Sequence, residues 1–169
     1  MDPVVFTSSS DSNVYVYLTE DIRQHLQRHF NDKMPGSKFF FDTPERLLQT
    51  IVDDYPDAIR KASFNEYGCK TVSILFPFDI GNCNVVSLKD VKEDELLSLQ
   101  IIQRDDIKAR CIKSKRIIPT KECQLILDEY NNVITVYPGE LAPPLPSSPD
   151  IHDEYWDNHV FVEPVEPNN

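Results

Sequence analysis

A change of hydrophobic period near residue 70 constrains the fold of this chain more than any other feature. Before it, apolar residues recur three and four positions apart, as on one face of a helix. After it, apolar and polar residues alternate, as along a strand. Helices followed by a run of strands are typical of an α+β fold. We therefore predict N-terminal helices packed on a roughly four-stranded antiparallel sheet.

Two N-terminal helices begin at residues that are good caps. Thr19 precedes the first helix, which carries Leu26 on its apolar face. Thr43 and Pro44 open the second helix, and Pro56 breaks or kinks it. Both helices are therefore expected before the change of period.

The second part of the chain carries the strand signals. Alternation predicts strands at 70–76, 85–88, 107–111, 123–127 and 133–137. Residues 91–102 fit either a short helix or an extended segment, and residues 128–132 form a turn-forming cluster. The last two strands should therefore pair as a hairpin.

The composition changes again towards the C-terminus. We expect one α+β domain at residues 1–146 and an irregular, proline-rich, acidic tail at residues 147–169. Residues 150–169 carry six acids and no lysine or arginine, which favours disorder. The same segment holds Trp156 and Phe161, so docking on the body of the protein or on a partner is the alternative.

Charge and cysteine usage narrow the class of protein. A net charge of −11 argues against a general nucleic-acid coat protein, although it leaves room for a small local site. The four cysteines lack CxxC or zinc-ligand spacing, so reduced thiols in the cytoplasm are expected. The N-terminus has no signal-peptide pattern, and no apolar run is long enough for a membrane helix.

One stretch opposes the overall charge. Arg104–Lys121, here called the basic island, contains seven basic residues and only two acids. Its basic residues are Arg104, Lys108, Arg110, Lys113, Lys115, Arg116 and Lys121. Such an island most often faces a phosphate or an acidic segment of the same chain.

Two histidines offer candidate chemistry. His25 and His29 lie four positions apart and would project from one face of a helix. A metal pair, a structural role and proton transfer are all open, but no third ligand stands at a useful spacing. We predict no metal and no cofactor.

Arg110, Thr135 and Thr120 each have an ordinary alternative. Arg110 is either a solvated side chain or a clamp for the acidic tail; Thr135 is a common β-former, and Thr120 can simply start a strand. Together with an imidazole they fit metal-independent RNA cleavage. That reaction needs a base for the 2′-hydroxyl, an acid for the leaving 5′-oxygen and fixed donors around the phosphorane.

The order of these motifs resembles a known superfamily. It consists of His25-Leu-Gln-Arg-His29, then Ala109-Arg-Cys-Ile-Lys-Ser-Lys-Arg116, and finally Val133-Ile-Thr-Val-Tyr-Pro-Gly139 with a proline-rich exit. Over Tyr15–Pro146 the chain is similar to the barnase–EndoU–colicin–RelE-like small RNases of toxin and phage contexts.

The resemblance implies a metal-independent nuclease that acts on RNA. His25 or His29 would be the acid–base group, Arg110 would bind the scissile phosphate, and Thr135 with Thr120 would donate to the transition state. The implied phosphate-binding residues are Lys108, Lys113, Lys115 and Arg116. Its partners would be the RNA substrate and a cognate inhibitor protein.

Two features depart from that pattern, the acidity and the C-terminal extension. One hypothesis joins them: the acidic tail covers the basic island as a phosphate mimic, anchored by Trp156 and Phe161. The competing function is a non-enzymatic acidic binding protein, namely an immunity protein, an antitoxin or an adaptor that presents Leu141–Pro146. Such a protein would act on a basic partner.

Overall fold

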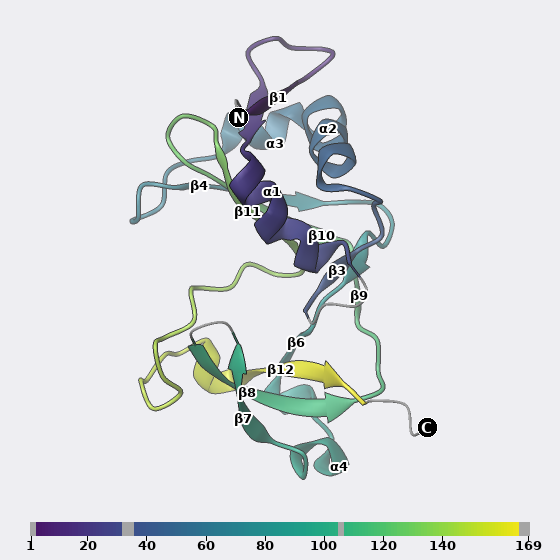
Figure 1. Ribbon diagram of the computed structural model, residues 1–169, viewed down its shortest axis with the longest axis vertical. Helices are drawn as coiled ribbons and strands as arrows, with labels where there is room; N and C mark the ends of the chain where they lie inside the picture. The colour runs from purple at the N-terminus through teal and green to yellow at the C-terminus, as the bar shows by residue number, and fades with distance from the viewer. Residues whose placement is uncertain (1–2, 32–35, 105–106, 166–169) are drawn as a thin grey trace. The chain divides into compact units, whose positions relative to one another are not determined.

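The computed structural model describes residues 3–31, 36–104 and 107–165. The chain forms two compact units (Figure 1). Unit 1 comprises Met1–Asn82 and Pro119–Glu140, and unit 2 comprises Cys83–Ile118 and Leu141–Asn169. Residues 1–146 and the tail 147–169, which the sequence separates, both contribute to unit 2.

The helices of unit 1 start where the sequence predicts. Helix α1 follows Thr19, whose hydroxyl accepts a hydrogen bond from the Ile22 amide at 3.3 Å. Helix α2 follows Thr43, whose hydroxyl accepts from the Arg46 amide at 3.2 Å, and Pro56 separates α2 from α3. The bounds are Glu20–Leu26 for α1, Gln27–His29 for the 3₁₀ turn η1, Pro44–Asp54 for α2 and Pro56–Lys61 for α3.

The strands of unit 1 form three small antiparallel groups. They are β1 (Val4–Thr7), β2 (Tyr15–Leu18), β3 (Lys38–Phe39), β4 (Lys70–Leu75), β5 (Gly81–Asn82), β9 (Pro119–Thr120), β10 (Glu122–Leu127) and β11 (Val133–Pro138). Strands β1 and β2 form a hairpin, β10 lies between β11 and β4, and β5 lies between β3 and β9. The turn cluster at 128–132 joins β10 to β11, as predicted.

One hydrophobic core holds unit 1 together. The apolar stripe of α2 is fully buried and belongs to the same cluster as alternate residues of β4, β10 and β11. Its members include Leu47, Leu48, Ile51, Val52, Val72, Ile74, Leu125 and Val136. Burial of each such side chain stabilises the folded state by about 1.5–3 kcal/mol. The packing of α2 on this face of the sheet therefore holds the helix in place.

Unit 2 is built on a four-stranded sheet in the order β6-β12-β8-β7. Its elements are β6 (Val85–Ser87), η2 (Leu88–Asp90), α4 (Glu93–Leu96), β7 (Gln100–Arg104), β8 (Ile107–Ser114), η3 (Trp156–Asn158) and β12 (His159–Pro164). Strand β12, the yellow arrow in Figure 1, runs antiparallel to β6 and parallel to β8. Val86, Ile112, Val160 and Val162 form the core of this unit.

The α+β class is confirmed, but two finer predictions are wrong. The strands do not form a single four-stranded sheet, because they are shared among several sheets. The C-terminal segment is not irregular throughout, since His159–Pro164 is a strand with a neighbour on each side. The ambiguous stretch 91–102 contains both a helical turn and the start of a strand. None of the described helices reaches the length and apolarity that a membrane crossing needs.

Gly81 provides a test of the β3-β5-β9 group. A Cβ atom at this position would lie 2.2 Å from the Lys38 carbonyl oxygen, so a side chain forces the two strands apart. We expect Gly81→Ala to lower the free energy of unfolding by about 2–3 kcal/mol, as overpacking does. Chemical denaturation, monitored by circular dichroism, measures this change in the free energy of unfolding.

Gly68→Ala is the matched control, because a Cβ there meets nothing within 4 Å and only its φ of +76° is unfavourable. Gly68→Ala should lower the free energy of unfolding by only about 1 kcal/mol. Equal losses at the two glycines would show that the close approach at Gly81 does not matter.

Candidate functional site

Five basic residues of the basic island lie on strand β8 and in the loop that follows it, whereas Arg104 ends β7 and Lys121 lies between β9 and β10. Lys108, Lys113 and Lys115 are exposed, whereas Arg110 and Arg116 are partly buried. Ala109 and Cys111, which flank Arg110 on the strand, are buried. The strand therefore turns its lysines to solvent and keeps its guanidinium groups close to the protein.

Arg110 is bound to the C-terminal segment of its own unit. Its guanidinium Nη2 donates to the main-chain carbonyl of Trp156. The Trp156 indole is buried, donates from Nε1 to the Pro143 carbonyl at 2.9 Å and stacks on Phe161 with ring centroids 5.2 Å apart. One acceptor of the Arg110 guanidinium is thus a peptide carbonyl of its own unit.

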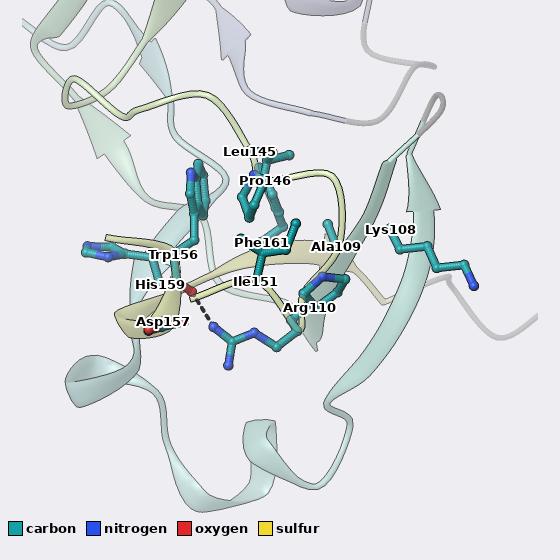
Figure 2. Close-up of a pocket in the computed structure, with 11 residues that line it drawn as sticks. Lys108, Ala109, Arg110, Leu145, Pro146, Ile151, Trp156, Asp157, His159 and Phe161 are labelled. Atoms are coloured by element: carbon teal, nitrogen blue, oxygen red, sulfur yellow. Dashed lines mark hydrogen bonds between the residues drawn. The ribbon is translucent and has the colours of Figure 1, made fainter. Parts of the chain in front are cut away.

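These residues surround a small hollow in unit 2. Figure 2 shows Leu145, Pro146, Trp156 and Phe161 converging around it, while the Lys108 side chain extends away. Its volume is about 20 Å³. A water molecule needs about 10–15 Å³ on the same measure, so the hollow has room for water.

Arg116 also has partners within unit 2. Its Nε atom lies 3.1 Å from the Glu95 carboxylate, and its Nη2 donates to the Asp90 carbonyl at 3.3 Å. The Ser114 hydroxyl and the Lys92 amide, with Arg116 nearby, hold the pKa of Glu95 below its usual value. Both arginines of β8 and its loop therefore have acceptors in the chain itself.

The two histidines of unit 1 have different surroundings. His25 is exposed on α1, where the Arg28 guanidinium donates to its ring. The Nδ1 atom of His29 lies 2.8 Å from the Ser37 carbonyl oxygen, so Nδ1 carries the hydrogen. Burial lowers the pKa of His29 to about 4, despite the hydrogen bond to Ser37. His29 is therefore neutral at pH 7 and tethers the segment that holds Ser37.

The two predicted threonines lie on different strands of unit 1. Thr135 pairs with Ile126 across the β10–β11 ladder and is partly buried. Thr120 pairs with Gly81, and its hydroxyl accepts a hydrogen bond from the Glu122 amide at 3.1 Å. Thr120 thus has a local structural role at the start of β10.

The predicted site residues are divided between the units. His25, His29, Thr120 and Thr135 belong to unit 1. Lys108, Arg110, Lys113, Lys115 and Arg116 belong to unit 2. Neither unit contains the complete predicted set.

A buried glutamine near the Val133–Gly139 motif was missed by sequence reasoning. Gln124 accepts a hydrogen bond from the Ser73 hydroxyl at 2.6 Å and donates to the Gly139 carbonyl at 3.0 Å. It fixes the exit of β11, where Gly139 has a φ of +115°. Alternation places Gln124 on the polar face of β10, so nothing in the pattern signals its burial.

Within the described residues, no three His, Cys, Asp or Glu side chains come together as a metal-binding group. None of the family models, curated proteins or solved structures compared with this chain matches it.

The low pKa of His29 predicts how stability depends on pH. An unfolded histidine has a pKa near 6.5, so the unfolded chain takes up a proton there while folded His29 does not. Stability contributed by neutral His29 is complete above pH 6.5 and falls as the pH drops towards 4, by roughly 3 kcal/mol in all.

Urea unfolding between pH 7 and pH 4.5 measures this loss. His29→Asn, which keeps a donor for Ser37, should lack this part of the pH dependence, whereas His25→Asn should retain it. If the free energy of unfolding depended on pH equally in the unaltered protein and in both variants, His29 would not be the source of the pH dependence.

The place of β12 predicts the effect of truncation. Because β12 lies between β6 and β8 and supplies Val160 and Val162 to the core, removal of residues 147–169 should unfold unit 2. Loss of the dispersed amide signals of residues 83–118, with those of unit 1 retained, would show this by NMR.

A milder pair of variants tests the same contact. Val160→Ala should destabilise unit 2 by about 2 kcal/mol, whereas Val165→Ala, at a more exposed valine, should have little effect. A truncated chain that keeps a folded β8 would contradict the role of β12.

Proposed function

We propose that the protein is a metal-independent endoribonuclease. The observation that carries the proposal is the exposure of Lys108, Lys113 and Lys115 in a chain of net charge −11. Three exposed lysines within eight residues of so acidic a chain are suited to an anion partner, and lysine binds an RNA phosphate as a point charge. The resemblance of the His25, Ala109–Arg116 and Val133–Gly139 motifs to small RNases supplies the reaction class.

The roles of the candidate residues follow from their surroundings. His25 is the acid–base group, because it is the exposed member of the histidine pair and His29 is neutral and tethered. Thr135 donates its hydroxyl hydrogen to a phosphorane oxygen. Within unit 2, Arg110 can bind an RNA phosphate only after it exchanges the Trp156 carbonyl for a phosphate oxygen.

The proposed reaction balances without a metal. The neutral His25 imidazole takes the proton of the 2′-hydroxyl, and the 2′-oxygen forms a new bond to phosphorus. The bond from phosphorus to the 5′-oxygen breaks, and that oxygen takes a proton from water. The hydroxide so formed takes the proton held by His25, which returns to its starting form. The products are a 2′,3′-cyclic phosphate and a free 5′-hydroxyl.

A second candidate function is non-enzymatic binding of a basic protein. The specific observation in its favour is that Arg110 and Arg116, the groups best suited to bidentate phosphate binding, already have acceptors in unit 2. Strand β12 also places Glu163 in register with Lys113. An acidic chain in which Arg110 and Arg116 already contact acceptors of their own unit fits an immunity protein or an antitoxin.

An RNA cleavage assay in EDTA separates the two functions. We expect the unaltered protein to release 2′,3′-cyclic phosphate ends, and His25→Ala to lower the rate by about 10²-fold or more. His152→Ala is the matched control, because His152 is an exposed histidine of unit 2 outside the predicted site. An unaltered protein that leaves RNA intact would favour the binding function.

RNA affinity tests the lysines separately from the chemistry. Substitution of Lys108, Lys113 and Lys115 by alanine should weaken binding of single-stranded RNA and reduce the slope of log affinity against log salt by about 2. Lys89→Ala is the control, since Lys89 is exposed but lies outside the basic island. An unchanged salt slope in the triple variant would remove the basic island from the RNA site.

A further inference from the structure

A cluster of aromatic side chains lies at one end of unit 1. The aromatic patch, as we call it, is formed by Tyr15, Tyr17, Phe64, Tyr67 and Tyr130. Tyr15 and Tyr17 lie on β2, Phe64 and Tyr67 lie in the loop before β4, and Tyr130 lies in the turn between β10 and β11. Because Lys70 at the start of β4 pairs with Leu127 at the end of β10, that loop and that turn meet at the same end of the sheet.

Asn131 connects the three segments of the aromatic patch. Its carbonyl accepts a hydrogen bond from the Tyr17 amide at 2.9 Å, and its side-chain amide donates to the Tyr15 carbonyl at 3.2 Å. Its side-chain oxygen accepts from the Lys70 ammonium at 2.7 Å. Lys70 in turn lies 5.4 Å from the centre of the Phe64 ring. Hydrogen bonds through Asn131 and Lys70 therefore hold together the three segments that carry the residues of the patch.

Asn131 adopts an unusual conformation to make these contacts. Its φ is +67°, and among the described residues it is the only non-glycine with a positive φ. Asparagine tolerates this conformation better than most residues, although the conformation still has a cost. The Asp128 carboxylate also accepts from the amides of Tyr130 and Asn132, both at 2.8 Å. The turn that presents Tyr130 is thus rigid before anything binds.

The rings on this patch are unusually open to solvent. Phe64 is 55 %, Tyr67 71 % and Tyr130 70 % exposed. Single exposed apolar residues are common on protein surfaces, whereas a contiguous set held by a rigid backbone marks an interaction surface. Tyrosine and phenylalanine are also enriched at protein–protein interfaces, because they bury a large area with little loss of side-chain entropy.

The charges around the patch identify the kind of partner. Glu66 and Glu129 are exposed beside Tyr67 and Tyr130, whereas Lys70 is already engaged by Asn131 and the Phe64 ring. An acidic rim repels RNA phosphates and also the same rim of a second copy of the chain. A rim of lysine or arginine on another protein would complement it.

We propose that the aromatic patch is a docking surface for a second protein that presents an apolar face with a basic rim. This surface lies on unit 1 and shares no residue with the proposed RNA-cleaving site, so it goes beyond that function. The aromatic rings bury apolar area against the partner, while Glu66 and Glu129 select its charge. Asn131 keeps the rings in their binding arrangement.

Two synthetic peptides serve as probes, one alternating lysine with leucine and one alternating glutamate with leucine. Isothermal titration should show that the lysine peptide binds the unaltered protein and that Phe64→Ala/Tyr130→Ala weakens this binding at least tenfold. Phe40→Ala is the matched control, since Phe40 is a 59 % exposed aromatic of unit 1 outside the patch. None of these substitutions changes the net charge, so general attraction to an acidic protein is equal in all of them.

Charge reversal tests the rim. Glu66→Lys/Glu129→Lys should shift the preference towards the glutamate peptide, while the melting curve stays that of the unaltered protein. No binding of the lysine peptide, or equal loss in Phe40→Ala, would overturn the proposal. So would concentration-dependent self-association, or binding of poly(U) RNA, that disappears in the Phe64→Ala/Tyr130→Ala variant, since the occupant would then be a second copy or a nucleic acid.

Discussion

The antiparallel pairing of β4 with β10 is the interaction on which unit 1 depends. Glu122 to Leu127 pair in register with Leu75 to Lys70, although the segment that builds most of the unit 2 sheet lies between them in the chain. Bringing β4 and β10 together closes a long loop, which lowers the conformational entropy of the chain before any contact can stabilise it. The core that these strands form with α2 offsets that cost, and β11, which carries Thr135, pairs with the other edge of β10.

The sequence predicts those parts of the fold that depend on neighbouring residues. Thr19, Thr43 and Pro44 define their helix starts by local hydrogen bonding and fixed φ, and alternation identifies the strands from residue 70 onward. The sheet order and β12 escape prediction because they depend on partners distant in the chain. Val160 and Val162 lie in an acidic, proline-containing segment and become a strand only because β6 and β8 leave room between them.

The same distinction holds for the candidate site. Spacing places His25 and His29 on one helical face, but only the fold shows that one ring is solvated and the other is neutral and bonded to the Ser37 carbonyl. The basic island is visible in the sequence as a charge asymmetry. That Arg110 binds a peptide carbonyl while Lys113 stays in solvent depends on β12, which local patterns do not reveal. Gln124 and the aromatic patch likewise follow from pairing between distant strands.

The parallel pairing of β12 with β8 has a consequence for synthesis on the ribosome. Strand β8 emerges well before β12, and until then its edge has no partner from the C-terminal segment. All the strands of unit 1 have been made by the time Pro138 emerges, whereas the unit 2 sheet must wait for β12. Unit 1 can therefore complete its strands before the unit 2 sheet is able to form. In the interval one edge of β8 has no strand beside it.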